Sequence, residues 1–306
     1  MIFVRPRAVR ALLGFAMLSM ACSPAGGPAS APVASGAKGT LLIVGGGAAP
    51  PELPKRFVEL AGGPGHARIA VIPMASEEAQ ASGDEKKAQL DSLGGNSFVF
   101  LIDRAQAMDT ATLKQLEGVT GVWFCGGDQI RLTRILLGTP VLAEIKRLYR
   151  DGAVLGGTSA GAAIMSDSML TGNQYGADSL GYYGDEYDGV RRHFIEVVPG
   201  LGFLSGAIID QHFLRREREN RLLSVVLERP SLVGIGIDEG TALEVGPSGP
   251  WRIEGASAAL VFDARHSTVT DSTQPLLGAK GLEVHLLPAG SSYDLSTGRA
   301  TLPTTR

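Results

Sequence analysis

Five consecutive residues, Gly157-Thr158-Ser159-Ala160-Gly161, place one serine between two glycines with the spacing G-x-S-x-G. An apolar run precedes this segment, and the alanine-rich residues after it favour a helix. A serine at a sharp turn from strand to helix is the nucleophile elbow of many hydrolases, and glycines permit such a turn because they lack a Cβ. The pattern therefore predicts Ser159 as a nucleophile, and a small-residue turn without chemistry is the alternative interpretation.

A serine hydroxyl is a weak nucleophile at neutral pH and needs a neighbouring base. The chain contains five histidines, and only His212 is expected at the end of a strand beside other polar residues. We interpret His212 as the general base, with a structural histidine as the alternative. The segment after it is expected to be a helix carrying Arg216, Arg218 and Arg221. These arginines could clamp a carboxylate-rich substrate, or could form a solvated helix face.

The composition is that of a globular protein, with 306 residues of which 44% are hydrophobic and 19% are charged. The formal net charge of −3 argues against a broad surface for nucleic acid. Neither zinc-type spacing nor H-E-x-x-H occurs, so no metal is expected. The run Gly45-Gly46-Gly47 lacks the third glycine of a dinucleotide loop, and Pro50 follows it, so no nucleotide cofactor is expected.

The first 22 residues resemble an export signal. Arg5, Arg7 and Arg10 precede an apolar core at residues 11–20, which is too short to span a membrane as a helix. The following Ser19-Met20-Ala21-Cys22 resembles a bacterial lipobox, with Ser19 in place of the usual leucine, and it predicts a lipid anchor at Cys22. Cleavage without lipidation is the alternative. Loss of the three arginines lowers the formal net charge from −3 to −6.

Residues 23–38 are rich in Pro, Ala, Gly and Ser, which predicts a flexible linker before a catalytic domain at residues 39–306. Apolar runs, including one at 98–103, then alternate with helix-like segments. This alternation predicts an α/β fold with a doubly wound, mainly parallel sheet and a site beyond the carboxyl ends of its strands. Residues 172–192 are expected to form a long loop, and a β-rich part is expected from Trp251 onward.

Several segments resemble the cyanophycinase branch of the serine peptidase family that also holds the aspartyl dipeptidases of the peptidase E type. They are Gly126-Gly127-Asp128-Gln129, the Ser159 elbow, Gly200-Leu201-Gly202-Phe203-Leu204, Asp210-Gln211-His212-Phe213 with the arginines after it, and residues 236–242. The resemblance spans roughly residue 39 to the C-terminus. It implies a fold similar to that of class I glutamine amidotransferases.

The resemblance also implies roles for single residues. Ser159 would be the nucleophile, His212 the base, and the amides near Gly127 and Ala160 the oxyanion hole. The residues implied to line the substrate pocket are Gln129, Asp210, Gln211, Arg216, Arg218 and Arg221.

The family further implies a carboxylate between the serine and the histidine in the sequence. The candidates are Asp178, Asp185, Glu186 and Asp188. Counting back from Gly200 favours Asp188, whereas counting forward from Ser159 favours Asp178. We predict Asp188 as the third catalytic residue.

The implied function is that of an exported serine exopeptidase, secreted or held in the cell envelope, that acts on cyanophycin. This polymer is a polyaspartate with arginine on each β-carboxyl group, and the family releases β-Asp-Arg dipeptides from it. The alternatives are an α-aspartyl dipeptidase of the same family and a catalytically inactive lipoprotein that binds acidic peptides. The expected partner is the polypeptide substrate, and a homodimer is left open.

Overall fold

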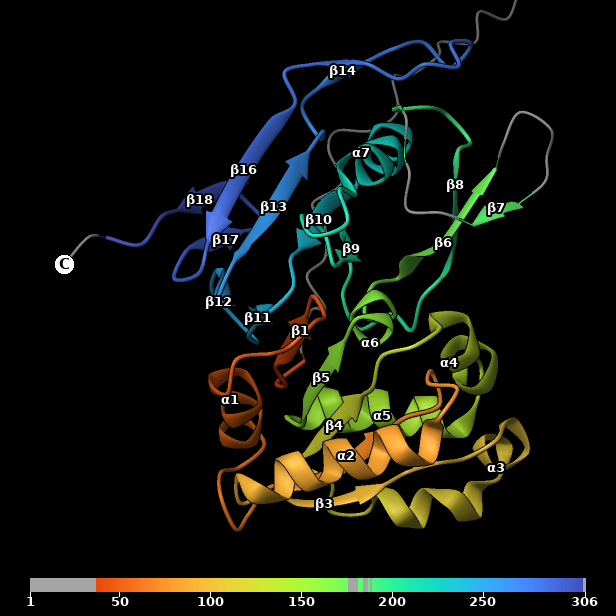
Figure 1. The fold of residues 1–306 in the computed structure, drawn as a ribbon, viewed down its shortest axis with the longest axis vertical. Coiled ribbons are helices and arrows are strands. Elements are labelled where there is room, and N and C mark those ends of the chain that lie inside the picture. The colour runs from red at the N-terminus through yellow and green to blue at the C-terminus, as the bar shows by residue number, and fades with distance from the viewer. Residues whose placement is uncertain (1–36, 176–180, 184–186, 188, 305–306) are drawn as a thin grey trace, which may run out of the picture. The chain divides into compact units, whose positions relative to one another are not determined.

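The computed structural model describes residues 37–175, 181–183, 187 and 189–304. A nine-stranded sheet with the order β18-β17-β12-β11-β1-β5-β4-β2-β3 runs through the domain (Figure 1). Its strands are β1 (Leu41–Val44), β2 (Arg68–Ile72), β3 (Asn96–Val99), β4 (Gly121–Phe124), β5 (Val154–Thr158), β11 (Thr241–Val245), β12 (Trp251–Gly255), β17 (Ser292–Asp294) and β18 (Arg299–Thr301). The first five of these pair in parallel, and the other four continue the sheet antiparallel.

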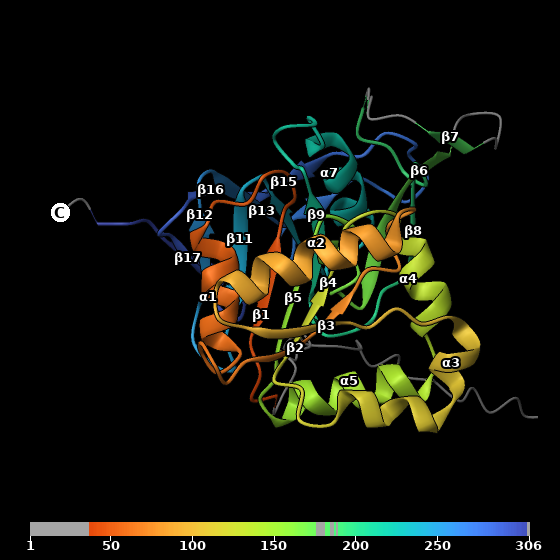
Figure 2. The ribbon, with the colours of Figure 1, turned by 60° about the horizontal axis from the view of Figure 1, so that its bottom comes forward.

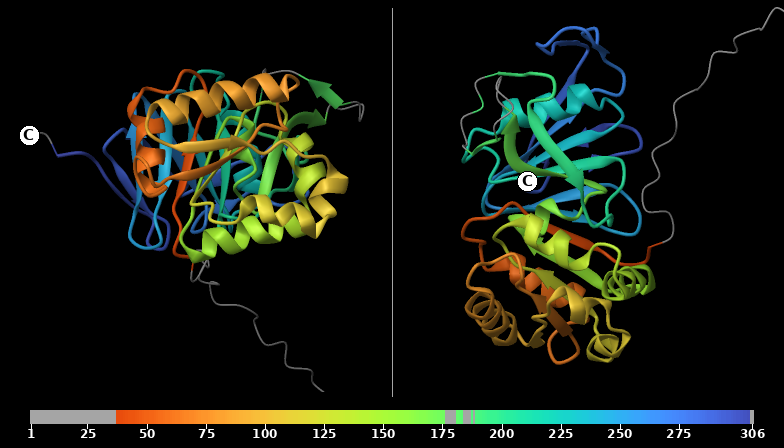
Figure 3. Two further views of the ribbon diagram at one scale, coloured as in Figure 1. Left: turned by 90° about the horizontal axis from the view of Figure 1, so that it is seen from below. Right: turned by 90° about the vertical axis from the view of Figure 1, so that its right-hand side faces the viewer.

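Helices cover both faces of the parallel strands, which explains why these strands are apolar along their whole length. The helices are α1 (Glu52–Leu60), α2 (Ala79–Ser92), α3 (Arg104–Met108), the 3-10 helix η1 (Thr110–Leu116), α4 (Gln129–Leu136), α5 (Pro140–Asp151), α6 (Ala160–Ala163) and α7 (Glu219–Glu228). Leu42 and Val44 pack with residues of α1 and α2, whereas Leu41 and Ile43 pack with residues of α3, α4 and α5. Figure 2 and the left view of Figure 3 show α2 and α5 on opposite sides of the strands.

A second, four-stranded sheet has the order β16-β13-β10-β9. Its strands are β9 (Ala207–Gln211), β10 (Val233–Ile237), β13 (Ala258–Asp263) and β16 (Glu283–Pro288). One face of this sheet shares a core with the larger sheet, and α7 covers the other. Close packing of α7 depends on Gly234, because a Cβ there would lie 2.5 Å from Val226 Cγ2. The carboxyl ends of β9 and β10 thereby face the same region as the end of β1.

A third, three-stranded sheet has the order β7-β6-β8 and replaces part of the loop that was expected at residues 172–192. It consists of β6 (Ser168–Tyr175), β7 (Gly181–Tyr183) and β8 (Ile195–Pro199). The pairing of β6 with β8 shifts register between Leu170 and Gln174. This irregular register hides the strand period in the sequence. A short pair, β14 (Thr268–Val269) and β15 (Ala279–Lys280), completes the described strands.

The mainly parallel α/β architecture and the β-rich C-terminal part agree with the sequence prediction, and two local predictions are wrong. The strand expected at 98–103 ends at Val99, because Asp103 forms a capping box with Gln106 that begins α3. Arg216 and Arg218 precede α7, which begins at Glu219. In the described part of the chain, every helix is too short or too polar to cross a membrane.

Candidate active site

Ser159 lies in a sharp turn between β5 and α6. Its backbone has φ 53°, a left-handed conformation that costs free energy for a residue with a side chain. Two glycines allow the turn to close: a Cβ on Gly157 would lie 2.3 Å from the Gly161 carbonyl oxygen, and one on Gly161 would lie 2.2 Å from the Phe124 carbonyl oxygen. The structure therefore has the strand, turn and helix of a nucleophile elbow at Ser159.

His212 follows β9 and contacts Ser159 directly. The distance from His212 Nε2 to Ser159 Oγ is 2.9 Å. The His212 amide donates to the Gly45 carbonyl oxygen at 2.7 Å, and its φ of 50° is also in the left-handed region. The turn after β9 is thus anchored to the end of β1, and the imidazole is within hydrogen-bonding distance of the serine hydroxyl.

Glu239 holds the other nitrogen of the imidazole. It follows β10, and its Oε1 lies 2.6 Å from His212 Nδ1. The glycines after β1 provide the space: a Cβ on Gly46 would lie 2.4 Å from His212 Nε2, and one on Gly47 would lie 2.6 Å from Glu239 Oε2. The glycine run that resembles an incomplete dinucleotide loop thus lies against the histidine and the glutamate.

Among the described residues, the carboxylate that contacts His212 is Glu239, and the prediction of Asp188 stays untested. Asp188 lies outside the described residues. So do the alternatives Asp178, Asp185 and Glu186. Both ring nitrogens of His212 are engaged, by Ser159 and by Glu239. Glu239 lies in residues 236–242, which resemble the family, but the resemblance implies an acid between the serine and the histidine and so does not point to Glu239.

Burial lowers the pKa of His212 below its ordinary value. The hydrogen bond and charge of Glu239 oppose this shift, and the positive charges of Arg216 and Arg218 add to it. The imidazole is therefore neutral at neutral pH. With Nδ1–H donated to Glu239, Nε2 is free to accept the serine proton.

The loop after β4 passes beside Ser159. A Cβ on Gly126 would lie 3.3 Å from Ser159 Cβ, so the backbone of this loop lies against the nucleophile. Gly127 has φ 133°, and a Cβ there would lie 2.2 Å from the Ala75 carbonyl oxygen, so only glycine fits. Ala160 is the first residue of α6, where amides have no acceptor within the helix. These are the two segments from which an oxyanion hole was predicted.

Four of the predicted substrate residues, Asp210, Gln211, Arg218 and Arg221, are buried and form hydrogen-bonded pairs. Arg221 donates through Nε and Nη2 to both oxygens of Asp210, and through Nη1 to Tyr187 Oη at 2.7 Å. Although burial opposes it, the Asp210 carboxylate raises the pKa of Arg221 above its ordinary value. Arg218 Nη1 donates to the backbone oxygen of Gln211 at 2.7 Å and to its Oε1 at 3.1 Å. These groups hold the strand end that precedes His212.

The other two predicted substrate residues lie elsewhere around the site. Arg216 is exposed, and its charge acts on His212. Gln129, at the start of α4, is buried and donates through Nε2 to the carbonyl oxygens of Leu170 and Thr171 at 2.9 and 3.0 Å. This contact ties α4 to β6.

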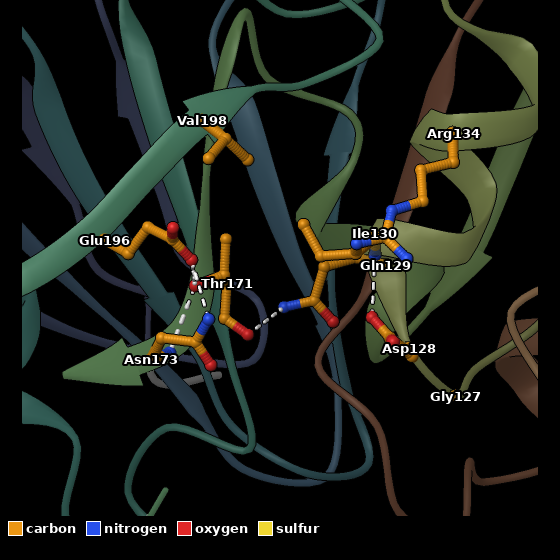
Figure 4. A pocket seen from close by; sticks show the side chains of 9 residues that line it. All are labelled: Gly127, Asp128, Gln129, Ile130, Arg134, Thr171, Asn173, Glu196 and Val198. Atoms are coloured by element: carbon orange, nitrogen blue, oxygen red, sulfur yellow. Dashed lines mark hydrogen bonds between the residues drawn. The ribbon is translucent and has the colours of Figure 1, made fainter. Parts of the chain in front are cut away.

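A cavity of about 650 Å³ adjoins the loop after β4 (Figure 4). It is lined by Gly127, Asp128, Gln129, Ile130, Arg134, Thr171, Asn173, Glu196 and Val198. Of the predicted substrate residues, only Gln129 lines it. The sequence analysis does not predict the wall from β6 and β8: Asn173 falls in the loop expected at residues 172–192, and Thr171, Glu196 and Val198 flank that loop.

A sequence profile of peptidase family S51 matches residues 41–249. The chain belongs to this family. Its relatives include the cyanophycinase of Synechococcus elongatus, which is 32% identical over 274 residues covering 86% of this chain and 81% of the relative. The cyanophycinase of Geminocystis herdmanii is 32% identical over 270 residues, covering 85% and 95%. As a member of family S51, the protein is a serine-type peptidase.

The crystal structure of a peptidase from an acI-B1 actinobacterium has a similar fold, with a TM-score of 0.59 and 22% identity. The similarity covers 82% of this chain and 98% of that one. It agrees with the mainly parallel α/β fold expected from the sequence.

We expect Arg221→Met to destabilise the protein by about 3–5 kcal/mol, because it leaves the buried Asp210 carboxylate without its cation. Urea unfolding of the purified protein measures this loss. The control is Arg131→Met, which removes a partly exposed ion pair with Glu77 and should cost about 0–1 kcal/mol. Equal, small losses for both variants would contradict a structural role for Arg221.

We expect the acidic limb of the kcat/KM profile of the wild type to lie below the ordinary histidine pKa of about 6.5, because protonation of His212 removes the base. Arg216→Gln removes a charge that lowers this pKa, so the limb should move to higher pH. Glu239→Gln removes a group that raises it, so the limb should move to lower pH. Arg215→Gln, an exposed neighbour, is the control, and an equal shift in both arginine variants would contradict the assignment.

Proposed function

We propose that the protein is an exported cyanophycinase that uses Ser159, His212 and Glu239 as its catalytic triad. The observation that carries this proposal is the continuous hydrogen-bonded chain from Ser159 Oγ through the His212 ring to Glu239. The same constellation of hydroxyl, imidazole and carboxylate performs acyl transfer on several unrelated folds. The cyanophycinases among its relatives support the choice of substrate.

In the proposed reaction, Ser159 Oγ attacks the scissile carbonyl carbon while His212 Nε2 takes its proton. The amides of Gly127 and Ala160 stabilise the negative oxygen of the tetrahedral intermediate. The imidazolium, stabilised by Glu239, then donates its proton to the leaving amine, and an acyl-enzyme remains. Water repeats the sequence with His212 as base, which releases the product acid and restores the serine.

We assign the role of the acid to Glu239 instead of Asp188. A histidine has two ring nitrogens, and one carboxylate at Nδ1 is sufficient to fix its tautomer and orientation. The 2.6 Å contact from Glu239 supports this choice.

Among the predicted substrate residues, we assign different tasks to the exposed and the buried ones. Arg216 is exposed near His212 and is proposed to contact the acidic polymer. Asp210, Arg218 and Arg221 are buried and bonded to one another or to Gln211, so they are proposed to position the His212 turn. Substitution of one of these residues should lower kcat, because His212 would no longer be held in position to act as the base.

The purified protein is expected to release β-Asp-Arg from insoluble cyanophycin, measured by chromatography of the soluble products. Ser159→Ala should retain less than a few per cent of the turnover, because it removes the nucleophile. Glu239→Gln should lower kcat by on the order of 10²-fold or more, whereas Asp188→Asn serves as the matched control and should not. A larger loss of kcat in Asp188→Asn than in Glu239→Gln would overturn the choice of Glu239.

The same assay separates the alternative functions. Hydrolysis of α-Asp dipeptides without hydrolysis of the polymer would indicate an aspartyl dipeptidase. Binding of the polymer without any hydrolysis would indicate a binding protein.

The proposed export rests on the N-terminal sequence, which lies outside the described residues. Mass spectrometry of the protein from native membranes is expected to find diacylglycerol on Cys22 as the first residue. A Cys22→Ser variant should be released from membranes or remain unprocessed. A soluble mature chain that begins beyond Cys22 would exclude the lipid anchor, and a chain that retains residues 1–22 in the cytoplasm would exclude export.

A further inference from the structure

The cavity beside the loop after β4 has one wall with a single carboxylate and one wall with both a carboxylate and a guanidinium. Figure 4 shows Glu196, Thr171 and Asn173, from β8 and β6, on one side, and Asp128 and Arg134, on and beside α4, on the other. Gly127, whose amide belongs to the proposed oxyanion hole, lines the same cavity. The cavity thus adjoins the place where the scissile bond would lie.

Glu196 is held by neutral groups alone among the described residues. Thr171 Oγ1 and Asn173 Nδ2 each donate to Glu196 Oε2 at 2.7 Å, and Tyr175 Oη donates to Oε1 at 2.9 Å. The hydrogen bond from Thr171, followed by those from Tyr175 and Asn173, lowers the pKa of Glu196 against the effect of burial. The carboxylate is therefore ionised and fixed in direction, and its negative charge is not neutralised.

A carboxylate has about four positions at which it accepts hydrogen bonds. Three are used by the neutral donors, so one remains for a further donor. A cation is the group that gains most at such an oriented charge, because charged hydrogen bonds are roughly twice as strong as neutral ones. The wall formed by β6 and β8 is thus complementary to a positively charged group.

Arg134 provides the opposite charge on the other wall. Its side chain is exposed at the cavity, and its guanidinium has no hydrogen-bond or ion-pair partner in the described part of the chain. Asp128, on the same wall, accepts from the Ile130 amide at 2.8 Å and pairs with Arg131, whose Nε lies 4.0 Å from Asp128 Oδ2. The two walls together match a ligand with a cation at one end and a carboxylate at the other.

We propose that this cavity binds the arginyl branch of the substrate, with Glu196 receiving the guanidinium and Arg134 the α-carboxylate. The proposal rests on the proposed function. In that polymer each arginine is attached through its α-amine, so its guanidinium and its carboxylate both remain free. A cavity of about 650 Å³ is of the size that holds small ligands, and it has room for such a branch. Glu196 thereby determines specificity without taking part in bond cleavage.

The test uses short synthetic oligomers of β-Asp-Arg and the same oligomers with citrulline, the neutral isostere of arginine. The wild type should have a kcat/KM at least about tenfold higher for the arginine oligomer, mainly through KM. Glu196→Gln should lose that preference by reduced activity on arginine, and its activity on citrulline should stay within a factor of about three of wild type. Glu283→Gln, a carboxylate on β16 outside the cavity, should change neither value.

A second variant tests the other wall. Arg134→Gln should lower kcat/KM for the arginine oligomer about tenfold, and it should have little effect when the branch carboxylate is replaced by a carboxamide. Preserved activity of each variant on the matching neutral oligomer shows that the protein has folded.

The outcomes that overturn the proposal differ from those that overturn the function. If Glu196→Gln lowers activity on both oligomers equally, the carboxylate only joins β6 to β8, and the specificity role is wrong. If the wild type has the same kcat/KM for the arginine and the citrulline oligomer, the cavity does not recognise the charge of the guanidinium. If wild type hydrolyses neither oligomer, the proposed function itself fails and the inference falls with it.

Discussion

The hydrogen bond between Glu239 and His212 Nδ1 is the interaction on which the site depends. It fixes which ring nitrogen carries the proton, and it holds the ring against the backbone of Gly46. Burial and nearby arginines make the protonated ring unfavourable, whereas Glu239 makes it favourable. These opposing effects leave the His212 ring neutral but still able to accept a proton during a reaction, which is what general base catalysis requires.

Much of the remaining architecture serves to bring three strand ends together. Ser159 follows β5, His212 follows β9 and Glu239 follows β10, so two different sheets contribute to one site. The link between the sheets is the backbone of the Gly45-Gly46-Gly47 run, which accepts the His212 amide and leaves space for both side chains. The buried pair of Arg221 and Asp210 then secures the end of β9.

The sequence was sufficient to predict the parallel sheet and the elbow, because both depend on local patterns. A continuous apolar run indicates a strand that is buried on both faces of its sheet, and G-x-S-x-G indicates a tight turn with no room for side chains at the two glycines. Glu239 could not be derived in the same way, since its contact with His212 joins residues that are 27 positions apart and belong to different turns. A carboxylate after a strand is a weak signal until the fold shows which imidazole it faces.

The residues predicted to bind substrate show the same limit of sequence analysis. The type and spacing of Arg218 and Arg221 are equally compatible with a substrate clamp and with a buried ion pair, and only the positions of Asp210 and Gln211 distinguish them. The wall at β6 and β8 is not apparent in the sequence because the pairing of the two strands shifts register, and three of its residues, Thr171, Asn173 and Glu196, are polar.

The long chain separation between the groups of the site also has a consequence for the time at which activity arises. The His212 amide donates to the carbonyl oxygen of Gly45, near the start of the domain sequence, and His212 lies 53 residues beyond Ser159. Contacts of this kind require a large loop to close, which costs conformational entropy. A nascent chain that ends before residue 212 contains Ser159 but not His212, so its serine has no neighbouring base of this kind. Ser159 therefore lacks its hydrogen-bonded imidazole until the later part of the domain has been synthesised and has folded onto the earlier part.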